Sequence, residues 1–297
     1  MEENIKKQKE KQAKLIVCLG ILFSSTAVIL IRWSTAPSLV LAAYRKTLVT
    51  LILLPMILVR YRGELRSLTP KKLLWCGLSG AFLALHFYSY FEGVQNTKIA
   101  SSQVLAGSEV IFVALAMWAS GKEKMSVRCI CGIVIAMGGS LLVSLGRSGG
   151  GDNIFYGNMM SILAAFSLAV YSLIGTSQRK DTSNTVYTFL VYGSAAILLN
   201  IMVGVSGYSY TGYGTVNFLC ALGMAVFNSL LGHSIFNWSF KYLSPTLVAM
   251  YKIFLPVLAA LWAFFLFAEV PLWNQIVGGI VVMGGIALYT ASKGVRK

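Results

Sequence analysis

Long apolar runs separated by short polar segments make up almost the whole chain. Each run is about 20 residues long, the length at which an α-helix crosses the hydrocarbon core of a bilayer. Backbone groups inside a membrane must bond within their own segment, so runs of this length indicate helices. The pattern predicts an all-α polytopic membrane protein with ten transmembrane helices, at 15–32, 39–59, 73–91, 101–120, 127–144, 156–176, 185–206, 216–237, 247–267 and 272–291.

The segments between the runs contain residues that favour turns. Proline follows threonine at 69–70, and the segment 146–151 is rich in glycine. The first run has a basic lead, as a signal peptide does, but no small-residue cleavage site with a soluble domain comes after it. We therefore interpret 15–32 as a retained span that follows a basic tail, 1–14.

Composition supports a membrane protein. Hydrophobic residues make up 57% of the chain and charged residues 12%, with a mean hydropathy of +0.72. These values exclude a water-soluble globular protein. The net charge of +15 would suggest nucleic acid as a partner of a soluble protein. Here the basic residues fall between the spans, so orientation in the membrane explains them and no nucleic-acid partner is expected.

The distribution of Lys and Arg predicts how the chain is inserted. Nineteen of these residues fall on the side of the N-terminal tail, and three (Arg32, Lys98 and Arg147) fall on the other. The remaining three lie within spans. Because basic loops stay in the cytoplasm, we expect both termini to be cytoplasmic in a multi-pass protein of the cell membrane.

The cysteines do not indicate a metal site. All five lie within spans or near their ends, without the spacing of metal ligands. Buried, reduced cysteine is the simplest interpretation. We expect neither a metal nor a cofactor.

An internal repeat relates the two halves of the chain at an offset of 146 residues, without gaps from 77 to 142. Its clearest instance is Met-Gly-Gly at 137–139, which recurs at 283–285. Such small residues let helices approach closely, either on a neighbouring span or on a second subunit. Each half holds five spans, an odd number, so the halves should form two inverted five-helix repeats with a site between them.

Glu109 is the strongest functional candidate, because it lies near the middle of the predicted span 101–120. A carboxylate there costs several kcal/mol on insertion scales, so it should face a protein interior and have a partner. At about 1.5 Å per residue, Glu109, His86 and Arg45 share a layer about 9 to 12 Å from the outer face. Lys252 lies about 10 Å from Glu109 along the membrane normal, so a direct ion pair would be stretched.

Each of these residues also has a structural interpretation. Arg45 and Lys46 could extend to the interface or brace the first loop, and Lys252 could extend to the cytoplasmic interface. His86 could be a packing residue on an aromatic-rich helix, and Glu109 could be neutralised as a purely structural group. Further candidates for substrate or proton binding are the polar and aromatic residues Gln103, Tyr88, His233, Asn237 and Tyr251.

Several motifs resemble those of EamA-type transporters of the drug/metabolite transporter superfamily. The first repeat of that family is matched by Phe82-Leu-Ala-Leu-His86-Phe and by Ala100-Ser-Ser-Gln-Val104-Leu. The second is matched by Gly232-His233, Asn237-Trp238, Lys241-Tyr-Leu-Ser-Pro245 and the stretch from Pro256 to Glu269. The resemblance covers 15–145 as repeat 1, spans 1–5, and 155–292 as repeat 2, spans 6–10.

The resemblance implies ten helices in two inverted halves, a central cavity and secondary transport, often export of amino acids or related metabolites. One position departs from the pattern, because relatives often carry Glu before the proline of span 9 and this chain has Leu255. The carboxylate stands instead at Glu109, which is the mate of Leu255 at the 146-residue offset. This departure weakens any transfer of a known coupling mechanism.

We therefore expect a secondary active transporter of a small polar or amphipathic metabolite, an exporter coupled to protons, that works by alternating access. The expected partners are a small-molecule substrate, protons and the lipid bilayer, and a homodimer stays open. Two alternatives are an intramembrane lipid-modifying enzyme using His86 or His233 and a non-transporting partner subunit. The enzyme has little support, because the chain has no Gly-x-Ser-x-Gly, HExxH or paired-Asp motif.

Overall fold

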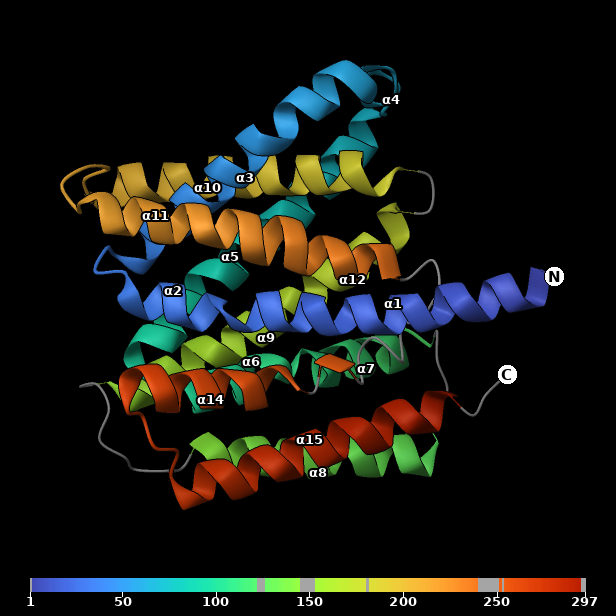
Figure 1. Ribbon diagram of the computed structural model, residues 1–297, viewed down its shortest axis with the longest axis vertical. Helices are drawn as coiled ribbons and strands as arrows, with labels where there is room; N and C mark the ends of the chain where they lie inside the picture. The colour runs from blue at the N-terminus through green and yellow to red at the C-terminus, as the bar shows by residue number, and fades with distance from the viewer. Residues whose placement is uncertain are drawn as a thin grey trace.

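The fold is a bundle of helices that lie side by side, seen in a computed structural model (Figure 1). The structure describes residues 2–121, 126–144, 153–179, 182–239, 251–252 and 254–294, and these contain no strand. The helices are α1 (Glu2–Ser25), α2 (Ala27–Trp33), α3 (Ser38–Arg60), α4 (Arg62–Arg66), α5 (Pro70–Asn96), α6 (Ile99–Gly107), α7 (Glu109–Ala119), α8 (Val127–Ser144), α9 (Ile154–Gln178), α10 (Asn184–Ser206), α11 (Thr215–Gly223), the π-helix η1 (Met224–His233), α12 (Ser234–Ser239), α14 (Leu255–Phe267) and α15 (Trp273–Gly294).

Within the described residues, seven helical stretches are long and apolar enough to cross a membrane. They are Lys11–Trp33, Ser38–Arg60, Pro70–Asn96, Ile99–Ala119, Ile154–Gly175, Asn184–Ser206 and Thr215–Gly232. Three apolar helices are shorter, Val127–Val143, Leu255–Phe267 and Trp273–Tyr289. The all-helical membrane architecture is thus confirmed, and the count of ten spans stays a prediction. The segment 146–151 and the predicted start of span 9 at 247 lie outside the described residues.

Local sequence explains where the helices begin and end. Thr69 caps α5 by accepting a hydrogen bond from the backbone N–H of Lys72, and Pro70 occupies the first helical position, where no N–H is needed. Ser183 caps α10 in the same way. Gly207 ends α10 at φ 75°, a left-handed conformation that glycine adopts without strain.

Three predicted spans are not single regular α-helices. The first breaks at Thr26, whose hydroxyl donates to the Phe23 carbonyl at 2.7 Å, and the fourth breaks at Ser108, between α6 and α7. The eighth changes to a π-helix over Met224–His233. Side-chain hydroxyls that bond back to the helix favour such breaks. Irregular backbone at membrane depth is tolerated only where protein or a wet cavity surrounds it, and π-helical turns often mark functional sites.

The helices α8 and α15 pack against each other at one edge of the bundle (Figure 1), and their backbones nearly touch. A Cβ at Gly132 would lie 2.8 Å from the Gly285 carbonyl oxygen, and one at Gly278 would lie 2.9 Å from the Gly139 carbonyl oxygen. The two contacts run in opposite chain directions, so the helices are antiparallel. Of the two partners expected for the Met-Gly-Gly segments, the neighbouring span is therefore the one that the structure shows.

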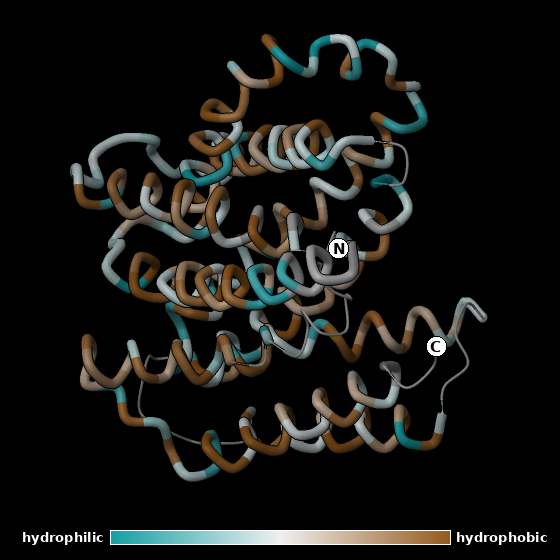
Figure 2. Tube along the Cα trace, turned by 45° about the vertical axis from the view of Figure 1, so that its right-hand side comes forward, coloured by the Kyte–Doolittle hydropathy of each residue, from teal (hydrophilic) through white to brown (hydrophobic). Residues whose placement is uncertain are grey.

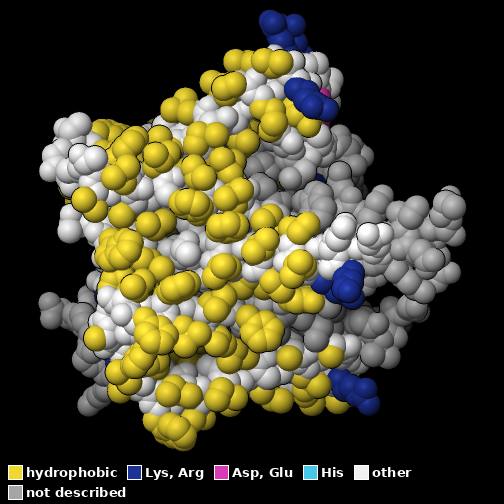
Figure 3. Space-filling view, in the orientation of Figure 1, with side chains coloured by type: hydrophobic (Ala, Val, Ile, Leu, Met, Phe, Trp, Pro, Cys, Tyr) yellow, Lys and Arg dark blue, Asp and Glu magenta, His cyan; other side chains and the backbone are white. Residues whose placement is uncertain are grey.

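The outside of the bundle is apolar, with its basic residues at one end. Hydrophobic residues follow the helices and polar residues gather in the connecting segments (Figure 2). On the face drawn in Figure 3, a broad hydrophobic surface covers the helices, and Lys and Arg lie at the end where α1 begins and α15 finishes. This pattern is typical of a protein surrounded by lipid.

Candidate functional site

The centre of the bundle holds two adjacent basic residues of α3. Arg45 and Lys46 are 2% and 0% exposed, so neither extends to the interface and that structural interpretation is wrong. The Arg45 guanidinium donates from Nε to the Ser229 hydroxyl of η1 at 3.1 Å and lies 4.3 Å from the centre of the Phe87 ring. A guanidinium over an aromatic face is stabilised by the ring quadrupole, more so where water is excluded.

Lys46 has an unusual environment. Its ammonium lies between two aromatic rings, 3.7 Å from the centre of Phe87 and 3.9 Å from that of Tyr192 on α10. It has no hydrogen-bond partner in the described part of the chain. Removing an ammonium from water costs several kcal/mol, and a cation–π contact returns about 2 kcal/mol when desolvated. The Lys46 charge is therefore only partly compensated.

His86 and Gln103 belong to the same region. The His86 ring bonds through Nδ1 to the Ala164 carbonyl of α9 at 2.8 Å, and it stacks on Tyr90, with 5.9 Å between ring centres. The Tyr90 hydroxyl donates to Oε1 of Gln103 on α6 at 2.7 Å. We call these residues the central cluster: Arg45, Lys46, His86, Phe87, Tyr90, Gln103, Tyr192 and Ser229.

Glu109 lies beside this cluster, at the first position of α7. Its carboxylate is 3.9 Å from the Lys252 ammonium, a long ion pair that agrees with the stretched pairing expected from sequence. The two side chains are 19% and 36% exposed, whereas Lys46 is fully buried. A carboxylate at a helix N-terminus is favoured by the helix dipole.

The other candidates lie elsewhere or outside the described side chains. Tyr88 hydrogen-bonds to Tyr156 of α9, which in turn donates to Glu92 at 3.1 Å, so it belongs to a separate contact between α5 and α9. Tyr251 packs on a small apolar cluster formed with α1. The side chains of His233 and Asn237 are not among those that the structure describes.

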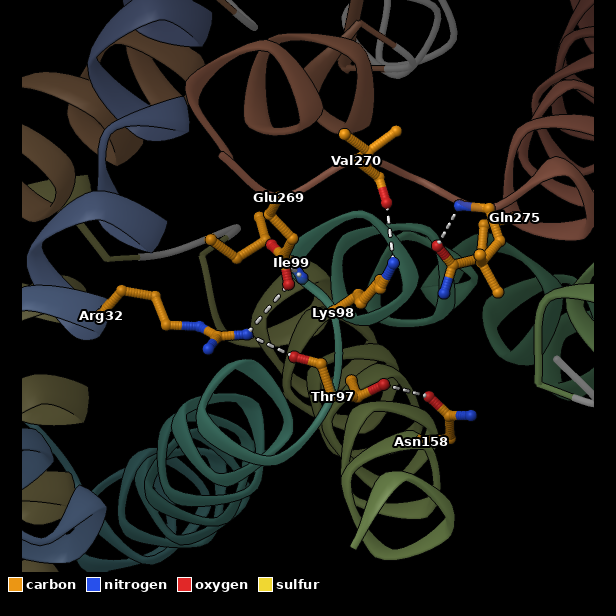
Figure 4. A network of polar contacts seen from close by, with 9 residues as sticks. Arg32, Thr97, Lys98, Ile99, Asn158, Glu269, Val270 and Gln275 are labelled. Carbon is orange, nitrogen blue, oxygen red and sulfur yellow. Dashed lines mark hydrogen bonds and ion pairs between the residues drawn. The ribbon is translucent and has the colours of Figure 1, made fainter. Parts of the chain in front are cut away.

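A second polar network closes the end of the bundle opposite the start of α1 (Figure 4). Arg32, near the end of α2, donates from Nη2 to the Thr97 carbonyl at 2.6 Å and pairs with Glu269 at 3.4 Å. The other Glu269 oxygen accepts from the backbone N–H of Ile99, at the start of α6, at 3.1 Å. Lys98 donates to the Val270 carbonyl at 2.7 Å. We call Arg32, Thr97, Lys98, Ile99, Glu269 and Val270 the outer network.

Sequence reasoning did not select the residues of the outer network. Arg32 and Lys98 entered only the count of charges on each side, and Glu269 entered only as the end of the stretch that resembles the second repeat of the family. The sequence did contain a signal for Arg32 and Lys98, because they are two of the three basic residues on the charge-poor side. An acid and a base at span ends on a charge-poor side favour each other as partners.

No metal centre is evident in the parts of the chain that the structure describes, where no three His, Cys, Asp or Glu side chains come together. The five cysteines are free thiols. The described residues of the site offer ionic and aromatic groups, namely buried cations, the partly exposed carboxylate of Glu109 and several ring faces.

Comparison with known proteins gives a consistent result. The model of the EamA-like transporter family matches residues 12–145 and again residues 155–291. An uncharacterized transporter of Archaeoglobus fulgidus is 24% identical over 219 residues, which are 73% of this chain and 74% of that protein. A crystal structure that is 18% identical has the same fold, with a TM-score of 0.64 over 97% of this chain and 99% of the other. The two family matches cover most of the sequence, so the chain belongs to the EamA-like transporter family and is a membrane transporter with transmembrane helices.

Proposed function

We propose that the protein is a secondary active transporter that exports a small metabolite with a carboxylate group, an amino acid or a related organic acid, in exchange for protons. The observation that carries the proposal is the only partly compensated positive charge of the central cluster. Arg45 and Lys46 are buried there, and the nearby Lys252 is matched by a single carboxylate, Glu109, at 3.9 Å. A substrate carboxylate that enters this region would complete the charge balance.

The aromatic rings of the cluster suit the rest of such a substrate. Phe87, Tyr90 and Tyr192 come from α5 and α10 and surround the buried cations. Small-molecule sites commonly combine apolar and aromatic walls with a few charged groups that fix orientation. The combination favours a metabolite with an acidic group and an apolar part over a fully polar one such as a sugar.

Glu109 is the residue we assign to proton coupling. It lies at the break between α6 and α7, and discontinuous helices are where many carriers place their ion and substrate sites. The carboxylate is 19% exposed in its long pair with Lys252, and we propose that a water-filled path reaches it. In the proposed cycle a proton and the ammonium group of an amino-acid substrate compete for the Glu109 carboxylate, so binding one releases the other, while the buried basic residues hold the substrate carboxylate.

Alternating access requires two halves that can reorient, and we propose that these are inverted repeats of five spans each. The packing of α8 on α15 supports this. At the 146-residue offset, Gly132 corresponds to Gly278 and Gly139 to Gly285. The contact of Gly132 with Gly285 therefore corresponds to the contact of Gly278 with Gly139, as a two-fold axis between antiparallel halves requires.

The outer network is the proposed gate on one side of the membrane. It joins α2 to the segments before α6 and after α14, so in this conformation it holds the outer end closed. The concentration of Lys and Arg at the other end supports cytoplasmic termini in the cell membrane. Export rests on the family resemblance alone.

A reconstituted transport assay tests the proposal. Purified protein in liposomes is given labelled amino acids, organic acids and neutral analogues of the same size, with and without a pH gradient. We expect uptake of one or more carboxylates, stimulated by the gradient, and little uptake of the neutral analogues. Glu109→Gln should lose the response to pH, whereas Glu64→Gln, an acid outside the spans, should keep it. Unchanged, pH-sensitive transport in Glu109→Gln would remove Glu109 from the mechanism.

A further inference from the structure

A cavity lies on the outside of the bundle. It is a groove of about 820 Å³ between α3, α5 and α10, and its wall includes Thr47, Leu51, Cys76, Gly77, Ser194 and Asn200. That volume falls within the range of small-molecule sites, about 300 to 1,000 Å³. The groove exists because α3 leans away from α10 as it runs toward α4 (Figure 1).

The wall of the groove presents mainly apolar groups to a ligand, although four of its residues have polar side chains. Asn200 donates to the Thr47 hydroxyl at 2.9 Å and to its own helix, and the Ser194 hydroxyl donates to the Leu190 carbonyl at 2.7 Å. The Thr50 hydroxyl donates to the Lys46 carbonyl at 2.7 Å. Because these groups already have partners inside the chain, the groove offers a polar solute little and suits a hydrocarbon chain.

The groove also opens to the surroundings of the bundle. Leu51 and Ile197 are 55% and 65% exposed at its edge. Along α10 it extends from Phe189 to Ile201, about 18 Å at 1.5 Å per residue. That is more than half of a hydrocarbon core about 30 Å thick, so its length matches the depth of one lipid leaflet.

Basic residues lie at one end of this groove. Lys72 is one helical turn before Cys76, and Arg60 lies about 13 Å beyond Leu51 along α3. With Arg62, Arg66 and Lys71 they make five cations in the segment 60–72, against one acid, Glu64. Glu64 accepts a hydrogen bond from the backbone N–H of Ser183 at 2.6 Å. No hydrogen bond or ion pair joins the five basic side chains to the described part of the chain.

We propose that this groove binds an anionic phospholipid. The acyl chain lies between α3, α5 and α10, and the phosphate headgroup lies among the basic residues of 60–72. The cations lie at one end of the groove, and the apolar wall extends from them toward the membrane centre. A phospholipid has the same order, with a charged headgroup followed by an apolar tail. Basic pockets beside transmembrane helices recognise anionic headgroups in this way.

The groove gives the bound lipid a route to influence the transporter. Thr47 and Thr50 form part of its wall; Thr47 follows Lys46 directly on α3, and Thr50 lies about one helical turn further along. The Lys46 ammonium itself lies between the Phe87 and Tyr192 rings of the central cluster. A lipid in the groove therefore supports α3 at the level of the central cluster.

Lipid binding by the delipidated, purified protein tests the proposal. Phosphatidylglycerol and phosphatidylcholine with the same acyl chains are added in detergent, and retained lipid is counted by native mass spectrometry. We expect phosphatidylglycerol to be retained at least about tenfold better, since each basic residue near an anionic headgroup adds to the preference. Equal retention of the two lipids would overturn the proposal.

Two variants address the two parts of the site. Gly77→Leu should fill the groove without a clash, because a Cβ at Gly77 meets nothing within 4 Å, and it should reduce retention of phosphatidylglycerol severalfold. Gly204→Leu is the matched control, since Gly204 also has open space, lies on α10 and is outside the groove. Full retention by Gly77→Leu would contradict the proposal.

The double variant Lys71→Gln/Lys72→Gln should reduce the preference for phosphatidylglycerol on the order of tenfold and leave retention of phosphatidylcholine unchanged. It changes only side chains at the surface end of α5, so it keeps the test valid should Gly77→Leu fail to fold. An unaltered preference would contradict the headgroup assignment. A stable dimer that forms without lipid and covers this face would assign the groove to a second copy and overturn the proposal.

Discussion

The Lys46 ammonium of α3 and the Tyr192 ring of α10 face each other across the middle of the bundle at 3.9 Å. This contact joins helices that come from the two matched halves of the family, 12–145 and 155–291. A cation held by ring faces, with no hydrogen bond, can move toward an arriving anion without first breaking an ion pair. The contact therefore suits a site that must bind and release an anionic substrate.

The first prediction concerns that lysine. Lys46→Met should raise the stability of the folded protein by about 1 to 4 kcal/mol, because an apolar group replaces a buried charge that has no ionic partner among the described residues. The same variant should lose transport of carboxylates. Melting temperature in detergent and uptake in liposomes measure the two effects, and Lys11→Met, on an exposed part of α1, is the control. A less stable variant with full transport would contradict the assignment.

The second prediction separates neighbouring glycines of α15. In Gly285→Ala the new Cβ would lie 2.5 Å from the Ala136 backbone nitrogen, so α8 and α15 must move apart, at a cost of about 1 to 3 kcal/mol. Gly284→Ala meets nothing within 4 Å and should lose no stability. The corresponding pair on α8 should behave alike, with Gly139→Ala destabilising and Gly138→Ala neutral. Thermal unfolding of the four variants measures this, and equal melting temperatures would show that the helices do not pack as described.

The third prediction concerns the outer network. Glu269→Gln removes the partner of Arg32 and weakens the bond to Ile99, contacts to a charged group that are worth about 1.5 to 3 kcal/mol each. The outer end should open more often, and a cysteine placed at Gln103 should react with an impermeant thiol reagent on the order of tenfold faster. Glu92→Gln is the matched control, because Glu92 accepts a hydrogen bond from Tyr156 and is not a member of the outer network. Identical labelling rates in both variants would exclude a gate at this position.

The fourth prediction concerns orientation. Ser67 follows α4 at the basic end, and Ser209 lies in the segment after α10 at the opposite end. In a background without the five native cysteines, Ser209→Cys should be labelled by an impermeant maleimide in intact cells. Ser67→Cys should be labelled only after the membrane is permeabilised. The reverse pattern would place the termini outside the cell.

The sequence alone predicted the class of protein and several residues of the candidate site. Apolar runs of membrane length predicted the helical bundle, and the rarity of charge inside those runs selected Glu109, Arg45, His86 and Lys252. The stretched pairing of Glu109 with Lys252 followed from rise per residue alone. These predictions depend on local pattern and on depth, which a linear sequence records directly.

Other features depend on which elements meet, and depth alone could not show them. The sequence left Lys46, like Arg45, either extending to the interface or bracing the first loop, and only the positions of Phe87 and Tyr192 show that it stays inside. The break at Thr26 is accompanied by contacts from Asn228, about 200 residues further along the chain. Hydropathy averages over such breaks, because one residue hardly changes the mean of a span.

The glycine contacts between α8 and α15 have a consequence for motion. They join the last helix of the first matched half to the last helix of the second at an edge of the bundle, with backbone against backbone. Sliding one helix along the other would drive carbonyl groups into Cα atoms, whereas a small rotation about the contact would not. Any reorientation of the halves has to pivot on this edge, and the displacement it produces grows with distance from the pivot.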